Sequence, residues 1–157
     1  MFREMRRKSQ QIVPEECRRI LTEEKRAVLS VLGDDGYPYG VPINFIYIPE
    51  DNSIYFHCAK EGHKLDSMRR CDKVCLTVHD SGYRKDDWSY YVNSVIVFGR
   101  ASIIEDLNLK REKARAFGAK YIPTKEELED GIDDGLSRIH MIRISIEHMT
   151  GKLVHEK

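Results

Sequence analysis

Six segments of the chain alternate apolar and polar side chains with the period of two that is typical of β-strands. Most are joined by short connections, and Asp34-Asp35-Gly36 between the first two is a strong hairpin signal. Short connections favour antiparallel pairing, because parallel neighbours need a long crossover. The pattern therefore predicts a mainly β (α+β) fold with a six-stranded antiparallel barrel rather than a βαβ fold. The segments are 27–32, 37–48, 54–59, 74–79, 91–105 and 141–146.

Two of these strands contain residues that limit where they can lie in the sheet. Pro38 and Pro42 have no N–H to donate to a ladder, so segment 37–48 is predicted at an open edge or beside a bulge. Segment 91–105 is the longest, and we expect it to cross the middle of the sheet. Gly99 within it predicts a bulge or a close backbone approach.

Helical patterns lie between the strands and predict a few peripheral helices. Pro14 followed by two glutamates suits a first helical turn, and we expect a short packing helix that ends near Lys25. A helical insertion is predicted over 107–137, before the last strand. The whole chain, 1–157, is long enough for one domain with its own core, and 1–11 is predicted to form a basic N-terminal arm.

Composition argues against several classes of function. The formal net charge is +0 at pH 7, so no global field attracts nucleic acid, and we expect no nucleic acid partner. A helix that crosses a bilayer needs about 20 apolar residues, and every apolar run in this sequence is far shorter. No secretory signal is recognisable either, so we expect a cytoplasmic protein that does not bind a membrane. Four cysteines are too few for a disulfide framework, and no metal site is predicted. Rossmann, P-loop, nucleophile-elbow and HExxH patterns are all absent from the sequence.

The segment from Ile54 to Arg70 is the most informative about function. It begins as an alternating strand, breaks at Gly62 and continues at helical spacing from His63, which predicts a strand, a turn and a helix N-terminus. Unpaired N–H groups and the helix dipole favour an anion there, and Lys64 adds a full charge, so the segment suits a phosphate. An ordinary strand-to-helix turn with solvated basic side chains explains the same spacing, and the spacing alone leaves both interpretations open.

Five blocks of the sequence resemble, in order and over nearly the whole chain, the nitroimidazole-resistance (Nim) branch of the pyridoxamine 5′-phosphate oxidase-like flavoproteins. The block at 55–66 is the most distinctive of them. The resemblance implies a six-stranded split β-barrel, generally a homodimer that binds FMN at the subunit interface. The blocks are MRRK at 5–8, DDGYPYGVPINF at 34–45, YFHCAKEGHKLD at 55–66, SVIVFGRA at 94–101 and IEHMTGK at 146–152.

The same resemblance implies a cofactor role for particular residues of this chain. Asn93 stands where the family often has an arginine before its Ser-Val pair, and the tryptophan and arginine signature of the oxidase itself is missing after Ile146. Pyridoxamine phosphate is therefore not the expected substrate. The implied cofactor-binding residues are Pro42, Ile43 and Asn44 for the isoalloxazine ring; His57, Cys58 and Ala59 for the ribityl chain and ring edge; Gly62, His63 and Lys64 for the phosphate; Ser94 and Val95 on a neighbouring strand of either subunit; and His148, Thr150, Gly151 and Lys152, which close the site.

Two functions from different classes fit the resemblance. The first is FMN-dependent reduction of nitroaromatic (5-nitroimidazole-like) or related small molecules, with the protein supplying orientation and electrostatics. The second is a flavin-binding or flavin-storing protein without catalysis. His57 is the candidate catalytic residue, because an imidazole titrates near neutral pH and can donate a proton. The alternative for His57 is a strand histidine that bonds the flavin or a backbone carbonyl.

Overall fold

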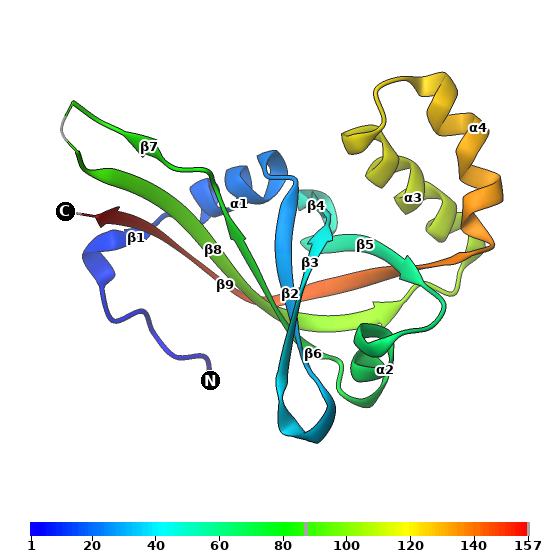
Figure 1. The fold of residues 1–157 in the computed structure, drawn as a ribbon, viewed down its shortest axis with the longest axis horizontal. Coiled ribbons are helices and arrows are strands. Elements are labelled where there is room, and N and C mark those ends of the chain that lie inside the picture. The colour runs from blue at the N-terminus through cyan, green and yellow to red at the C-terminus, as the bar shows by residue number, and fades with distance from the viewer. Residues whose placement is uncertain (87, 157) are drawn as a thin grey trace.

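The computed structural model describes residues 1–86 and 88–156, which form one antiparallel sheet curled around a core with helices packed against it (Figure 1). The main path of the sheet is β3-β2-β6-β8-β9-β5-β4, with β1 added to β9 and β7 added to β8. The strands are β1 (Gln11–Ile12), β2 (Arg26–Leu32), β3 (Pro38–Asn44), β4 (Ile46–Ile48), β5 (Ser53–Ala59), β6 (Lys73–His79), β7 (Tyr83–Arg84), β8 (Tyr90–Ile103) and β9 (Ile139–Glu156). The α-helices are α1 (Pro14–Glu23), α2 (His63–Arg70), α3 (Leu107–Tyr121) and α4 (Lys125–Leu136).

The predicted class, an antiparallel split β-barrel with peripheral helices, is confirmed, but the predicted number of strands is wrong, because the described sheet has nine strands instead of six. Two of the additional strands, β1 and β7, are two residues long, which is too short to leave an alternating pattern. The third arises because segment 37–48 divides into β3 and β4 at Phe45. There the backbone N–H and C=O bond to the hydroxyl of Tyr121 rather than to a neighbouring strand.

The way the sheet closes explains where the barrel is split. β3 and β4 lie at opposite ends of the sheet path although a single residue separates them in sequence, so the sheet must curl until its ends meet. β4 pairs only with 53–55 of β5, and β3 pairs only with β2 among the described strands. Both β3 and 56–59 therefore keep a free edge, and the barrel is open between them. The prolines of β3 had predicted such an edge.

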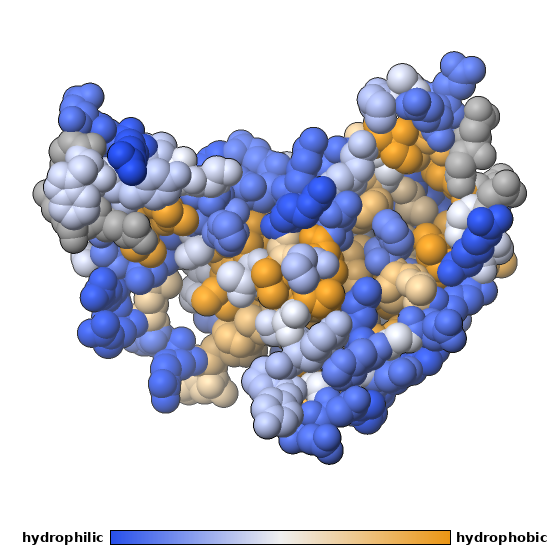
Figure 2. All heavy atoms as spheres, in the orientation of Figure 1, coloured by the Kyte–Doolittle hydropathy of each residue, from blue (hydrophilic) through white to orange (hydrophobic). Residues whose placement is uncertain are grey.

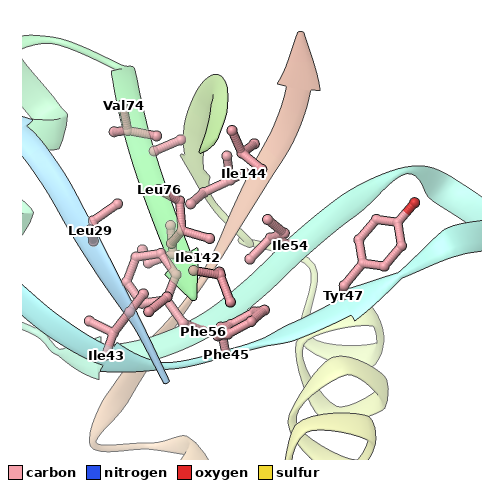
Figure 3. Packing of buried hydrophobic residues seen from close by; sticks show 14 of the residues in the cluster. Leu29, Ile43, Phe45, Tyr47, Ile54, Phe56, Val74, Leu76, Ile142 and Ile144 are labelled. Atoms are coloured by element: carbon pink, nitrogen blue, oxygen red, sulfur yellow. The ribbon is translucent and has the colours of Figure 1, made fainter. Parts of the chain in front are cut away.

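Inward-pointing residues of the strands fill the barrel (Figure 3). Leu29, Phe56 and Leu76 come from three different strands and are fully buried, and each such side chain contributes about 1.5–3 kcal/mol on burial. α1 adds Ile20 and Leu21 to the same core. The core therefore holds the strands that carry the candidate site in fixed positions.

β8 occupies the middle of the sheet, as its length predicts. Its pairing with β9 shifts register between Phe98 and Gly99, which confirms the predicted bulge. A Cβ on Gly99 would lie 2.4 Å from the carbonyl oxygen of Ser145, so only glycine allows this close approach of β9.

α3 and α4 form a separate lobe on the outer face of the barrel, within the range predicted for a helical insertion (Figure 1). α4 packs closely on α3 because Gly118 has no side chain: a Cβ there would lie 2.2 Å from Leu128 Cδ1. A second apolar cluster joins this lobe to β4, β5 and β9. Its buried members are Ile46, Tyr55, Ile104, Phe117 and Met141.

The N-terminal arm lies over the outer face of β8 and β9 rather than extending freely. The ring of Phe2 stacks on the ring of His148, with 4.6 Å between their centroids, and Gln11 and Ile12 pair with β9. All four cysteines are free thiols. No described helix is long and apolar enough to span a membrane, and the described side chains form no group of three or more potential ligands for a metal ion.

Candidate functional site

The junction between β5 and α2 has the local structure that the sequence predicts. Gly62 has a φ of +125°, a conformation that favours glycine, and α2 begins at the next residue. The amides of Leu65 and Asp66 bond to the carbonyl of Gly62, whereas the first amides of the helix, at His63 and Lys64, have no partner within the helix. A Cβ built on Gly62 would meet nothing within 4 Å, so the space beside the turn is open. This junction can therefore admit an anion to the N-terminus of α2.

His63 links the start of α2 to the β2–β3 hairpin. Its ring stacks on Tyr39, with 4.2 Å between centroids, and its Nε2 lies 3.5 Å from Asp34 Oδ2. Arg70 Nη2, at the end of α2, lies 2.6 Å from Asp34 Oδ1. The exposed Arg70–Asp34 ion pair contributes little stability, at most about 1 kcal/mol. Together, this ion pair, the His63–Asp34 contact and the ring stack hold the N-terminus of α2 against the open edge of β3.

The free edges of β3 and β5 face each other across the split. Ile46 pairs with Tyr55, and the same register continued past Phe45 would place Asn44 opposite His57 and Pro42 near Ala59. The contact between Tyr39 and His63 fits that register. The split therefore brings together the predicted residues of these elements, which we call the split group: Pro42, Ile43, Asn44, His57, Cys58, Ala59, Gly62, His63 and Lys64.

Not all members of the split group direct their side chains the same way. Ile43 and Cys58 belong to the core, and burial raises the pKa of the Cys58 thiol, so these residues can offer a ligand only their backbone. Pro42 and Ala59 are exposed, and Asn44 is half-buried at the end of β3. The polar side chains available along the split are therefore those of Asn44, His57 and the first residues of α2.

His57 points away from the core, as its position between two buried residues of β5 requires. Its ring meets the edge of Phe117 on α3, with 4.8 Å between centroids. Burial, and to a lesser extent the nearby charge of Lys64, lower the pKa of His57 below its usual 6.5. The imidazole is therefore uncharged at neutral pH, with one nitrogen able to donate and one able to accept. Sequence reasoning did not predict that Phe117 lies beside His57, because the two residues are distant along the chain.

The remaining predicted residues lie on β8 and β9, and we call them the β8–β9 group: Ser94, Val95, His148, Thr150, Gly151 and Lys152. Val95 is fully buried, and Gly151 faces inward, where a Cβ would lie 2.4 Å from Cys17 Sγ. The other members are half-buried on the outward face. Cross-strand neighbours bring all of them into one area: Ser94 opposite Lys152, Val95 opposite Gly151, Ile96 opposite Thr150 and Phe98 opposite His148.

A single chain does not bring the split group and the β8–β9 group into one pocket. On β9, Met141 is opposite His57 and Gly151 is opposite Val95. Ten residues of strand separate these two positions, which corresponds to roughly 33 Å at about 3.3 Å per residue. One small ligand cannot contact both groups of the same chain along this strand.

An apolar outward face of the sheet lies beside the β8–β9 group, and sequence reasoning missed it. Val28, Ile96 and Phe98 are 38%, 39% and 38% exposed, although such large apolar side chains are usually covered. A hollow of about 500 Å³ lies at the Phe98 end of this face, between the N-terminal arm, β2, β6 and β8. The sequence does contain a signal for this face: Val28, Ile96 and Phe98 occupy outward positions of alternating strands, where a polar residue is expected.

Comparison of the sequence and of the structure with known proteins identifies the family of this chain. A family model described as pyridoxamine 5′-phosphate oxidase matches residues 14–153, whereas no curated protein matches the chain. A candidate 5-nitroimidazole antibiotic resistance protein from Bacteroides thetaiotaomicron has a similar structure, with a TM-score of 0.80, 23% identity, and coverage of 92% of this chain and 87% of that one. A FAD-binding protein from Mesorhizobium loti has a TM-score of 0.68 and 24% identity, with coverage of 92% of this chain and 97% of that one. A FAD-binding protein from Mycobacterium smegmatis has a TM-score of 0.65 and 19% identity, with coverage of 94% of this chain and 99% of that one. These structures share the fold, and the family model shows that the chain belongs to the pyridoxamine 5′-phosphate oxidase family.

Proposed function

We propose that this protein is a flavin-binding oxidoreductase that reduces nitroaromatic or related small molecules, with the flavin lying along the split between β3 and β5. Membership of the oxidase family supports a flavin cofactor, as do the two similar structures described as FAD-binding proteins. The similar structure described as a candidate 5-nitroimidazole resistance protein supports the substrate class. The observation that carries the proposal is the open Gly62 turn, with the N-terminus of α2 and Lys64 beside it.

Lys64 and the first amides of α2 are the proposed phosphate ligands. A helix N-terminus and an ammonium group both favour a doubly charged terminal phosphate, which is the form of phosphate that FMN carries. We infer FMN rather than FAD for this reason. The free backbone edge of β3, around Pro42 and Asn44, would then meet the isoalloxazine ring.

A homodimer would complete the site. Along β9, Gly151 lies roughly 33 Å from the residue opposite His57, and His148, the nearest member of the β8–β9 group, lies roughly 23 Å from it, so this group would reach the flavin only from a second copy of the chain. The exposed apolar face formed by Val28, Ile96 and Phe98 is a suitable surface for that contact, since a stable interface buries an apolar centre.

A bound flavin would supply hydride chemistry. The residues of this chain would fix its position and set the environment of the substrate. Lys64 would neutralise the phosphate, and the β3 edge would orient the ring. His57, uncharged at neutral pH, would donate a hydrogen bond to an oxygen of the substrate.

Reoxidation of the reduced protein tests this function. The flavin-loaded protein is reduced without oxygen and mixed either with a 5-nitroimidazole or with air-saturated buffer. Reoxidation that is faster with the nitroimidazole than with dissolved oxygen alone supports a reductase. Bound flavin that is reoxidised no faster than by oxygen would instead identify a flavin-storage protein. Release of the chromophore and its identification decide between FMN and FAD.

A further inference from the structure

A separate cavity of about 360 Å³ lies between the α3–α4 lobe and the outer face of the barrel. Phe117, Leu128 and Ile132 line it from the helices, and Ile139 and Met141 line it from β9. His57, which projects from β5, forms another part of the wall. Hydrophobic surface is visible on this lobe in Figure 2. A space of this size is within the range that holds small organic ligands.

The described residues that line this cavity carry no fixed charge. Tyr121 is among them, but its hydroxyl is engaged by the backbone of Phe45. The imidazole of His57 makes no hydrogen bond to any described residue and only contacts Phe117 edge-on. The cavity therefore offers the imidazole of His57, which is still open to solvent, as a polar group beside apolar walls. The described lining residues supply no cation that would compensate the lost hydration of an anion, and the nearest charge that acts on His57 is that of Lys64 in the split group.

We propose that this cavity binds an uncharged, mainly apolar, planar molecule that forms a hydrogen bond with His57. Since His57 also belongs to the split group, the ligand would lie between the split and the α3–α4 lobe. Identifying that ligand with the reduced substrate rests on the proposed function, whereas binding to the cavity does not. Because the described lining carries no cation, we expect phosphorylated compounds such as pyridoxamine 5′-phosphate to bind this cavity less tightly than neutral ones.

The neutral, polarity-sensitive naphthalene dye Prodan is a suitable probe, titrated into the full-length protein both without flavin and loaded with FMN. Ala114 lines the cavity from α3, whereas Ala116 on the same helix is exposed, so the two alanines provide a matched pair. Ala114→Leu should weaken dye binding at least tenfold, and Ala116→Leu should change it less than twofold. Ile139→Phe fills the cavity from β9 and replaces Ala114→Leu if that variant does not fold.

Competition tests the charge of the ligand. Neutral 2-naphthamide should displace the dye at least tenfold more effectively than 2-naphthoate, which has a similar shape but a negative charge, and pyridoxamine 5′-phosphate should not displace it. Any of four results would overturn the proposal: equal displacement by the amide and the carboxylate, equal effects of the two alanine variants, displacement of the dye by FMN, or no dye binding.

Flavin content is measured separately. A protein that binds the dye but takes up no flavin contradicts the proposed function and leaves this inference standing.

Discussion

Removing the hydroxyl of Tyr121 should destabilise the protein, because this group bonds the backbone at the break between β3 and β4. The hydroxyl oxygen lies 2.9 Å from the amide nitrogen of Phe45, from which it accepts, and 2.6 Å from the carbonyl oxygen of Phe45, to which it donates. A second carbonyl, that of Lys25, is 2.9 Å away. Phe45 itself is fully buried. Tyr121→Phe keeps the ring packed and leaves a backbone N–H and C=O without this partner.

The expected magnitude follows from these two groups. An unsatisfied buried donor or acceptor costs about 1–3 kcal/mol. Because both hydrogen bonds are only part-buried, water can replace some of the lost bonding, so losing the hydroxyl should lower the free energy of unfolding by about 2–4 kcal/mol, the lower part of the range for two groups. For a domain of this size, 1 kcal/mol corresponds to roughly 2–4 °C, which predicts a melting temperature lower by roughly 4–16 °C. Thermal unfolding followed by circular dichroism measures this change in melting temperature. Tyr37→Phe is the control, because Tyr37 is 75% exposed. If both variants melt within about 2 °C of wild type, the hydroxyl does not hold the strand break.

Three further predictions concern single side chains. Lys64→Ala should raise the FMN dissociation constant roughly ten- to a hundredfold, because a charge-assisted hydrogen bond contributes about 1.5–3 kcal/mol, while Lys60→Ala should leave it unchanged; equal effects in a fluorescence titration would place the phosphate elsewhere. His57→Ala should slow single-turnover reoxidation by a nitroimidazole roughly ten- to a hundredfold at equal flavin occupancy, because a hydrogen bond to the charge that develops on the substrate oxygen contributes about 1.5–3 kcal/mol, and an unchanged rate would remove His57 from the mechanism. Burial lowers the pKa of Lys120 from 10.5 to about 8. The unfolded chain therefore binds more protons than the folded protein between these values, so wild type should gain stability relative to Lys120→Met as the pH rises from about 8 to about 10. A difference in urea unfolding that does not vary with pH would contradict that pKa.

The sequence predicted the features of this fold that depend on neighbouring residues. Alternation located the main strands, and Gly62 followed by helical spacing located the start of α2, because both signals are local. The break at Phe45 left no such signal. Phe45 continues the apolar alternation, and its backbone partner, Tyr121, is 76 residues away in sequence.

The candidate site was predictable to a similar extent. Alternation along β5 implies that His57 points away from the core, but only tertiary packing reveals that Phe117 and the α3–α4 cavity lie beside it. The distance between the split group and the β8–β9 group depends on the cross-strand register of β9, which motif order does not contain. Tertiary packing is likewise needed to see that Gly151 faces inward, toward Cys17 of α1.

The most direct test of the account is to measure flavin content and molar mass together. Protein stripped of cofactor is incubated with FMN and passed through a gel-filtration column with absorbance and light-scattering detectors. We expect a dimer that retains one flavin per chain, with a visible flavin spectrum. A monomer that retains its flavin fully would contradict the site shared between subunits, and protein that retains no flavin would contradict the central claim.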